Sequence, residues 1–296
     1  MSKLTKQQAK LHAQACDLMA TDKPLSWDDK DFILTNWRED ANHVNSAAGA
    51  FFTPLGMAFD AVLEMQGPRI LDLCAGIGAL SFAFWTRFNL GCAREAEITC
   101  VEINPDYVEV GKKILPNANW ITASVFDMPS DLGRFDTAIA NPPFGRVKAD
   151  GKPANYKGAD FEYRVIDKAM DYSNHGVFII PQSSANFSYS GRQDYRDTPS
   201  EKVQAFLKAT GLEMTPNCGI DTAIYDDEWH GVKPRVEIVC VEGTRLSRRP
   251  EGSHQPPSKV FQNAVMAEPA REQDTAPPVQ RKRAAAPANP NQFTLL

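Results

Sequence analysis

Polar residues that can bind ligands or take part in catalysis lie in or shortly after four apolar runs of the sequence. Asp72 lies in RILDLC and Glu102 in AEITCVEI, while Asp127 comes shortly after NWITA. Asn141 follows FDTAIA and is itself followed by Pro-Pro-Phe. Carboxylate and amide oxygens accept hydrogen bonds from amines and hydroxyls. If the four runs lie side by side, these residues form a binding site for a polar molecule.

The loop that begins at Asn141 is stiff. Pro142 and Pro143 each fix φ and remove a backbone donor, so the carbonyls of this loop have no ladder of hydrogen bonds to join. Phe144 adds an aromatic face directly after them. This combination predicts a loop that holds something flat and polar.

The segments around these residues alternate between strand and helix patterns. Helices of about 10–14 residues separate the strands, which predicts an α/β fold with a doubly wound, mostly parallel sheet. The last two strands, within 214–221 and 236–243, are too close for a crossover helix and predict a C-terminal antiparallel hairpin, giving seven strands in all. The other predicted strands cover residues 69–74, 96–103, 119–123, 135–140 and 175–181, and the helices between strands cover residues 78–88, 105–115, 160–173 and 200–210.

Three regions are predicted along the chain. Residues 1–47 form an N-terminal helical extension, and residues 48–245 contain the alternating pattern. Residues 246–296 are rich in Pro, Ala, Gln and charge, which predicts a disordered tail.

Local signals mark where the first helices begin. Thr5 and Gln8 can form a capping box for a helix within 4–20, and a second short helix follows Ser26. Thr53 is the predicted N-cap of the helix that opens the second region, with Pro54 at its first position.

Ligands of open α/β sheets bind outside the carboxyl ends of the strands. After the first predicted strand, Gly76 and Gly78 form a turn into a helix, where small residues let the backbone approach a ligand. A glycine turn of this kind also fits a dinucleotide site. At the next strand end, Glu102 is placed to accept both hydroxyls of a ribose.

These residues together resemble the S-adenosylmethionine-dependent amino-methyltransferases. The resemblance covers roughly residues 48–185. It lies in D-x-x-x-G-x-G from Asp72, the acidic end of the second strand, an Asp after the third, and N-P-P-F from Asn141. FFTP, residues 51–54, is similar to the upstream cofactor segment of DNA adenine methyltransferases. The resemblance implies a Rossmann-like methyltransferase sheet and S-adenosylmethionine as the cofactor.

The resemblance also implies a role for each residue. Thr53, Asp72 and the two glycines would lie near the methionine end of the cofactor, and Glu102 would bind its ribose. Asp127 would accept from the adenine amine, with Ile103 and Phe126 on either side of the ring. The implied cofactor-binding residues are Thr53, Asp72, Gly76, Gly78, Glu102, Ile103, Phe126, Asp127 and Asn141, and the implied catalytic residues are Asn141, Pro142, Pro143 and Phe144.

This loop can activate an exocyclic amine. Such an amine is a poor nucleophile because its lone pair is delocalised into the ring. The Asn141 side-chain oxygen and the Pro142 carbonyl can each accept one N–H, which pulls the nitrogen towards tetrahedral geometry. Phe144 offers a face on which an extruded base can stack. Direct transfer from a sulfonium then requires neither a metal nor a covalent nucleophile.

The loop after the catalytic residues indicates the substrate. It carries four positive charges against Asp150 alone, which predicts a track for phosphates. We therefore predict methylation of the N6 amine of adenine in DNA, with low or short sequence specificity, because no separate target-recognition domain follows residue 211. The predicted substrate-binding residues are Phe144, Arg146, Lys148, Lys152, Tyr156 and Lys157.

Several alternatives stay open at this point. Small rRNA adenine methyltransferases also carry NPPF, and protein glutamine methyltransferases use a similar NPPY. A non-catalytic protein that binds S-adenosylmethionine is a further class, although it has no need of the stiff loop. Trp229 and His230, in the loop 225–235, either touch the substrate or cover the sheet. Cytosine C5-methyltransferases are excluded, because none of the six cysteines follows a proline.

Composition and the tail complete the expectations. The chain has 296 residues and a net charge of −5, with no apolar run long enough to span a membrane and no secretory signal. Cysteines without a C-x-x-C pair suit a reduced cytoplasmic protein. Gln292–Leu296, QFTLL, resembles the short peptides by which bacterial DNA-processing proteins bind the replication sliding clamp.

Overall fold

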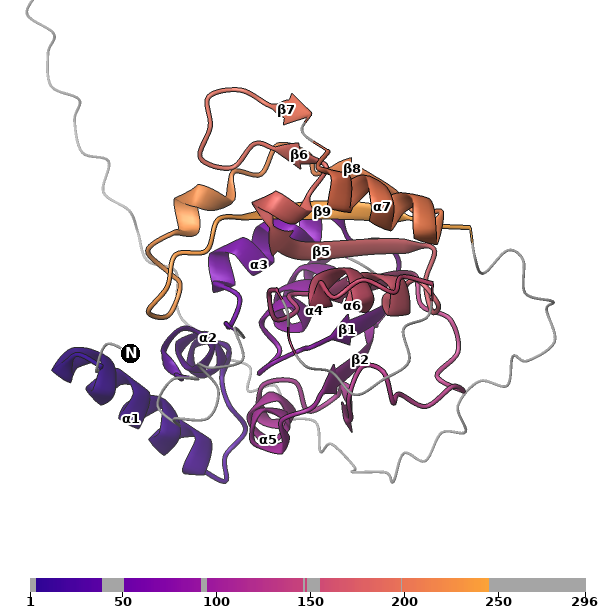
Figure 1. Cartoon of the computed structure of the whole chain (residues 1–296). Coiled ribbons are helices and arrows are strands. Elements are labelled where there is room, and N and C mark those ends of the chain that lie inside the picture. Colours follow the sequence, from indigo (N-terminus) through magenta and orange to yellow (C-terminus); the bar gives the residue numbers. More distant parts are fainter. Residues whose placement is uncertain are drawn as a thin grey trace, which may run out of the picture. The chain divides into compact units, whose positions relative to one another are not determined.

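Seven strands form one sheet in the computed structural model, which describes residues 4–38, 51–91, 95–145, 147, 155–197 and 199–244. The strands are β1 (Arg69–Leu73), β2 (Glu97–Glu102), β3 (Asn119–Thr122), β4 (Thr137–Ala140), β5 (His175–Pro181), β8 (Glu213–Pro216) and β9 (Val236–Glu242). They lie in the order β3-β2-β1-β4-β5-β9-β8, and Figure 1 labels β1, β2, β5, β8 and β9 of this sheet. Strands β1 to β5 are parallel, and β9 is antiparallel to both β5 and β8. The predicted seven-stranded, mostly parallel sheet is confirmed.

Helices follow most strands, as the alternating pattern predicts. The α-helices are α1 (Lys6–Ala20), α2 (Trp27–Asn36), α3 (Leu55–Ala61), α4 (Ala79–Gly91), α5 (Pro105–Ile114), α6 (Phe161–Ala169) and α7 (Glu201–Thr210). Short 3-10 turns are η3 (Val62–Glu64), η4 (Gln182–Ser184) and η5 (Thr222–Tyr225), and β6 (Phe187–Ser188) pairs with β7 (Arg196–Asp197) in a small second sheet.

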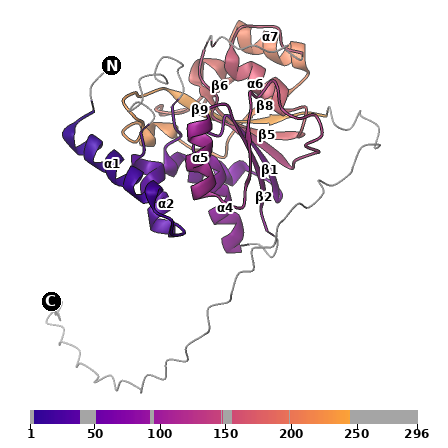
Figure 2. The same cartoon turned by 90° about the horizontal axis from the view of Figure 1, so that it is seen from below.

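The sheet separates two apolar cores. Side chains alternate across a strand, so Ile70 of β1 packs with α3, α4 and α5, while Leu71 and Leu73 pack with α6 and α7. Figure 2 shows α4 and α5 on one side of the strands and α6 and α7 on the other. Helices on both faces leave the carboxyl ends of the strands as the open edge for a site.

Capping residues set the helix boundaries largely as predicted. Thr5 and Gln8 form a reciprocal capping box before α1, and the Ser26 hydroxyl accepts the Asp29 N–H at the start of α2. Gly211, with φ of 66°, ends α7 in the left-handed conformation that glycine adopts without strain. These local choices agree with the global fold.

The predicted cap of α3 is wrong. Helix α3 begins at Leu55 with Pro54 in the cap position, and no side chain caps it. The Thr53 hydroxyl instead accepts a hydrogen bond from the Asn141 side chain. The Thr53 hydroxyl, which the local pattern predicts as the cap of α3, is thus used in a contact with a residue distant in sequence.

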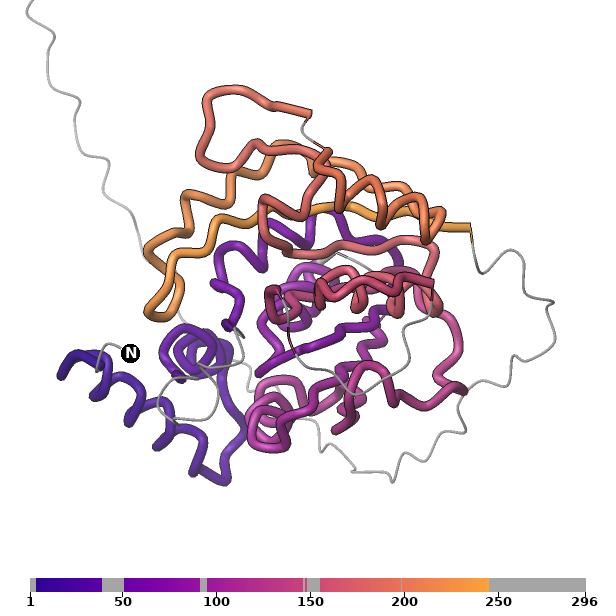
Figure 3. The backbone as a smooth tube through the Cα atoms, viewed as in Figure 1, coloured from indigo at the N-terminus to yellow at the C-terminus, as the bar shows by residue number. Residues whose placement is uncertain are grey.

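The C-terminal strands pair as predicted but do not form a tight hairpin. Strand β8 ends at Pro216, and residues 217–235, which contain η5, lie between it and β9. Figure 3 shows this connection passing close to the N-terminal helices. The His230 ring is 3.1 Å from the Thr35 carbonyl of α2, so residues 217–235 contact the N-terminal part of the chain.

Some predictions fall on residues outside those described. They concern Arg146, Lys148 and Lys152 of the basic loop and the whole region 246–296, including Gln292–Leu296. Among the helices of the described ranges, none has the length and apolar character needed to cross a membrane.

Candidate active site

The carboxyl ends of β1, β2 and β4 lie next to one another. In the central strand β1, Leu73 pairs with Val101 of β2 on one side and with Ala140 of β4 on the other. The next residues after these partners are Glu102 and Asn141. Parallel pairing therefore brings three of the predicted polar residues, including Asp72, to one edge of the sheet.

The turn after β1 uses its glycines for conformation and for space. Gly76 and Gly78 have φ of 56° and 93°, and a Cβ on Gly76 would lie 3.1 Å from the Phe52 ring. The Gly76 N–H donates to Glu102 Oε2 at 2.9 Å, so the turn is tied to the end of β2. Cys74 also has a positive φ, of 57°, for which the sequence carries no signal.

Asp72 is a buried carboxylate with one oxygen unused. Its side chain is 1% exposed, and Oδ2 accepts from the Ser81 hydroxyl at 2.6 Å. Burial, opposed by the Ser81 hydrogen bond and reinforced by the charge of Glu102, raises the pKa of Asp72 to about 7. Oδ1 is buried and accepts from no group in the described part of the chain. A buried acceptor left without a donor is costly, so this oxygen suits an amine or ammonium group of a ligand.

Glu102 is held firmly at the end of β2. Oε1 accepts the Asn104 N–H and Oε2 the Gly76 N–H, each at 2.9 Å. Burial raises the pKa of Glu102, and these backbone hydrogen bonds oppose the rise. Each oxygen keeps a second lone pair, so the carboxylate can still accept from a pair of hydroxyls.

Two apolar side chains flank the space beside Glu102. Ile103 is 68% exposed, which is high for an isoleucine next to a buried strand. Phe126 is half-buried, edge-on to Phe161, with the Arg164 guanidinium 4.7 Å from its ring centre. Asp127 beside it is exposed and its backbone N–H donates to the Ser124 carbonyl, leaving the carboxylate open to solvent and ligand.

The Asn141 side chain has one orientation that its surroundings allow. Its Nδ2 donates to the Phe51 carbonyl and to the Thr53 hydroxyl, both at 3.0 Å. A carbonyl only accepts, so the amide nitrogen must face it and Oδ1 must face away. Oδ1 is buried and accepts no hydrogen bond from the described residues. The FFTP segment thus fixes the amide so that its oxygen is left without a hydrogen bond from the described residues.

The rest of the stiff loop is set into the core. Pro142 is buried, and Phe144 is half-buried against the core cluster that includes α3 and α4. Its ring is therefore held by packing and keeps part of its surface for a partner.

The basic loop is described only at its end. Tyr156 is 7% exposed, its ring packs on Tyr163 and Phe206, and its hydroxyl donates to Asp160 at 3.1 Å. Burial and Asp160 raise the pKa of Tyr156 to about 12. The Tyr156 ring therefore lies in the core and not on the surface of the loop, whereas Lys157 is exposed.

Other residues singled out by the sequence have structural places. Trp229 lies in the apolar core and His230 contacts the Thr35 carbonyl. Within the described ranges, no cluster of three or more His, Cys, Asp or Glu side chains can hold a metal. Sequence reasoning missed Ser81, which bonds Asp72 from the first turn of α4, because a serine in a helix carries no signal of its own.

Comparison with known proteins gives relatives that match part of the chain, while no protein-family model matches it. The type II methyltransferase M.BsuBI of Bacillus subtilis is 29% identical over 178 residues, which cover 49% of this chain and 36% of that protein. The rRNA N(6)-adenosine-methyltransferase metl-5 of Caenorhabditis elegans is 26% identical over 133 residues, which cover 42% of this chain and 56% of that protein. The matches thus span less than two thirds of either relative.

A solved structure that aligns with part of this chain is the type I restriction-modification system methyltransferase subunit from Streptococcus thermophilus. It aligns with a TM-score of 0.45 and 12% identity, over 74% of this chain and 51% of that one. The sequence relatives, together with the strand order and the Asn-Pro-Pro-Phe loop, confirm the predicted resemblance to the S-adenosylmethionine-dependent amino-methyltransferases.

Proposed function

We propose that the protein transfers a methyl group from S-adenosylmethionine to the exocyclic N6 amine of adenine in DNA. The observation that carries the proposal is the orientation of Asn141, whose amide N–H groups are both taken by the FFTP segment. Its buried Oδ1 is left as an acceptor beside a proline carbonyl. An amine with two N–H groups fits this pair of acceptors.

The hydrogen-bond acceptors at the strand ends fit S-adenosylmethionine. Asp72 Oδ1 accepts the ammonium of the methionine end, beside the Gly76–Gly78 turn. Glu102 accepts the two ribose hydroxyls with its remaining lone pairs. Ile103 lies against one face of the adenine ring.

The remaining two residues of the cofactor site complete the adenine subsite. Phe126 lies against the face of the ring opposite Ile103, and the exposed Asp127 accepts its amine.

Each residue of the catalytic loop acts on the target base. When bound, S-adenosylmethionine supplies a methyl group on a sulfonium that a nitrogen lone pair can take directly. Asn141 Oδ1 and the Pro142 carbonyl accept the two N–H groups of the amine and so localise its lone pair. Pro143 keeps both acceptors in place, and Phe144 stacks on the extruded base.

DNA is the proposed substrate, and RNA is the second candidate. The relative with the higher identity is a type II methyltransferase, and the other methylates rRNA. The charges of Arg146, Lys148, Lys152 and Lys157 suit the phosphates of either. Only residues 217–235 lie between the last two strands, which favours short sequence specificity read by loops.

The test is transfer of a labelled methyl group. The full chain is incubated with labelled S-adenosylmethionine and with duplex DNA, single-stranded DNA, rRNA or a protein extract, and the products are digested and identified. N6-methyladenosine in RNA alone would move the substrate to RNA, and label on glutamine would move it to protein. No label in any product would remove the enzymatic proposal.

A partner follows from the last residues of the sequence. We propose that Gln292–Leu296 binds the bacterial sliding clamp, since a glutamine followed by apolar residues suits a peptide pocket. Such binding raises the concentration of the enzyme at newly made DNA.

This partner is tested with a labelled peptide of residues 287–296 and purified clamp in a fluorescence-polarisation assay. We expect saturable binding that is lost in a Phe293→Ala, Leu296→Ala peptide. Equal weak signals from the two peptides would end the idea.

A further inference from the structure

Gly145, the residue after the catalytic loop, makes hydrogen bonds to helix α6 with both its N–H and its carbonyl. Gly145 directly follows Phe144, and its carbonyl accepts the Phe161 N–H at 2.9 Å. Its own N–H donates to Glu162 Oε2 at 3.2 Å. Both donor and acceptor of Gly145 are therefore used by the first turn of α6.

Gly145 has a backbone conformation that needs such support. Its φ is 84°, in the left-handed region, and no atom of the described residues lies within 4 Å of where a Cβ would be. Space therefore does not require a glycine here, and conformation does. The contacts with α6 hold the chain in this conformation as it leaves the loop.

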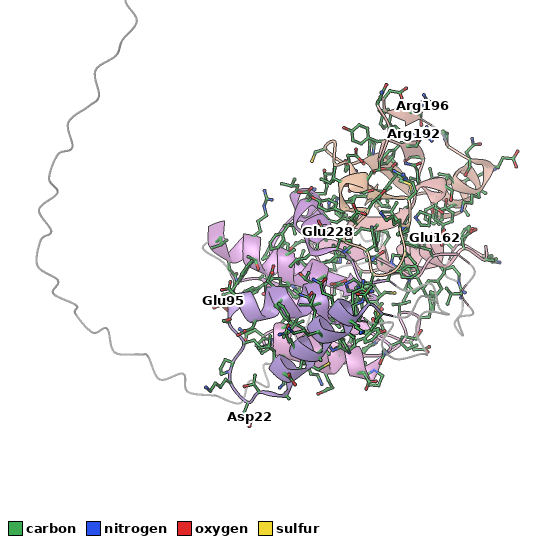
Figure 4. All side chains as sticks on the ribbon, turned by 90° about the vertical axis from the view of Figure 1, so that its left-hand side faces the viewer. Asp22, Glu95, Glu162, Arg192, Arg196 and Glu228 are labelled. Atoms are coloured by element: carbon green, nitrogen blue, oxygen red, sulfur yellow. The ribbon has the colours of Figure 1, made fainter. Side chains whose placement is uncertain are left out.

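Glu162 is an unusual group to find at this position. Its side chain is 1% exposed. The charged residues Asp22, Glu95 and Arg192, which Figure 4 labels together with Glu162, are all exposed. Taking a carboxylate out of water is costly unless hydrogen bonds compensate it. A helix residue that only filled space would be apolar, so the carboxylate indicates a task.

The second oxygen of Glu162 connects the loop to two more elements. Oε1 accepts the Ser184 hydroxyl of η4 at 2.7 Å. Lys202 of α7 donates to the same Ser184 hydroxyl at 2.9 Å and lies 3.9 Å from Oε1. Through Glu162, the loop after β4 is linked to the end of β5 and to α7.

We propose that Glu162 is a positioning residue for the catalytic loop. The loop is then fixed at both ends: Asn141 by the FFTP segment before it in sequence, and Gly145 by the carboxylate of α6. With both ends fixed, Phe144 and the two acceptors keep the geometry that the target amine requires. This inference rests on the proposed function, and it adds a residue that touches neither cofactor nor base.

Three substitutions separate positioning from simple stability. Glu162→Ala removes the acceptor of the Gly145 N–H, and Glu162→Gln keeps an acceptor oxygen. Ser184→Ala is the matched control, since it removes a buried hydrogen bond of Glu162 and leaves the contact with Gly145. We expect Glu162→Ala to lower kcat about 10- to 100-fold with unchanged affinity for S-adenosylmethionine, because a displacement of about 1 Å has that effect on a reaction rate. Glu162→Gln and Ser184→Ala should stay within about threefold of the wild type.

A fourth substitution covers the case in which Glu162→Ala does not fold. The added Cβ of Gly145→Ala meets no atom of the described residues within 4 Å, so the expected effect is strain at the positive φ. It should lower kcat in the same direction while the protein keeps its fold and its affinity for S-adenosylmethionine.

Hydrogen exchange gives a readout that does not depend on catalysis. In the wild type without substrate, the Gly145 amide should be protected. Exchange should be at least tenfold faster in Glu162→Ala and unchanged in Ser184→Ala. If the wild type transfers no methyl group, the proposed function fails, but this comparison still decides whether Glu162 holds the loop. Equal protection in wild type and Glu162→Ala, or an unchanged kcat in both Glu162→Ala and Gly145→Ala, overturns the inference.

Discussion

Two oxygen atoms of the site illustrate how single residues prepare it for ligands. Asp72 Oδ1 and Asn141 Oδ1 are both buried and accept no hydrogen bond from the described residues. Native proteins pair the great majority of such atoms, and these two, at neighbouring strand ends, are the acceptors that the proposed function assigns to cofactor and base. Each is held by a neighbour that bonds the other half of its side chain, Ser81 for Asp72 and Thr53 for Asn141.

Asn141→Ala should abolish methyl transfer and leave cofactor affinity within about twofold of the wild type. The amide acts on the target amine, and losing one preorganised group of this kind costs roughly 10²–10³ in rate. Transfer is measured with labelled cofactor, and affinity by calorimetry. Thr53→Val removes only one of the two acceptors of the amide, so it should keep a measurable rate. Rapid turnover by Asn141→Ala would remove this residue from catalysis.

Cofactor affinity should depend on pH through Asp72. Its pKa is raised to about 7, so the carboxylate is mostly neutral below that pH and charged above it. Binding of an ammonium requires the charge, and affinity should rise several-fold between pH 6 and 7.5. Folding favours the neutral form, so stability of the unliganded protein should fall as pH rises from about 4 through 7. Calorimetry and thermal unfolding measure the two trends, and Asp72→Asn should flatten both. Equal trends in this variant would assign them to other groups.

Elements rather than single residues determine how the site is assembled. The buried Glu237 of β9 accepts hydrogen bonds from the Gln182 amide, the Tyr189 N–H and both donors of Ser190. These donors come from η4 and from the connection between β6 and β7, which β9 therefore anchors. The reversed strand thus does more than complete the sheet.

Glu237→Ala should destabilise the protein by roughly 2–6 kcal/mol, because the two donors of Ser190, whose bonds are buried, lose their acceptor at about 1–3 kcal/mol each. Chemical unfolding measures the loss. Glu237→Gln keeps one acceptor oxygen and should lose clearly less. A loss below about 1 kcal/mol for the alanine variant would show that water replaces the carboxylate.

The elements were largely predictable from the sequence, and the links between them were not. Period-two apolar runs and caps such as Thr5 and Gly211 are local, so strands, helices and their order follow from pattern. The prediction that Thr53 caps α3 failed, because its hydroxyl bonds a residue 88 positions away. The roles of Glu162 and Ser81 could not be predicted either, because their partners lie outside their own helices. A polar residue in a helix is normally expected to be solvated.

Tyr156 shows the opposite error. An aromatic residue among lysines suggested a surface for bases, and its ring instead packs in the core. Motifs located the edge of the sheet that binds ligands, and only packing showed which neighbours support it.

At the scale of the whole molecule, an acidic chain must still approach a polyanion. The net charge is −5, so a local basic segment has to provide the attraction. The loop between Gly145 and Lys157 has the required composition and follows the catalytic residues directly.

Reversing the charges of Lys148 and Lys157 to Glu should weaken DNA binding and make it less dependent on salt. A complex with fewer phosphate contacts releases fewer counterions when it forms. Binding is measured by fluorescence anisotropy over a range of salt concentrations. The same charge change at the exposed Lys23 and Lys208 is the matched control and should leave the slope nearly unchanged. Equal slopes for the loop variant and the wild type would show that the loop is merely solvated.

The place of β9 has a consequence for how the chain folds during synthesis. Strand β9 lies between β5 and β8, yet of the strands in the described ranges it is the last to be made. Until Glu242 has left the ribosome, one edge of β5 has no partner strand. Six of the seven residues of β5 are buried in the finished protein. An unpaired apolar edge is a template for association with other chains. A nascent chain that stalls before Val236 therefore exposes this edge, and shielding by a chaperone matters most in that interval.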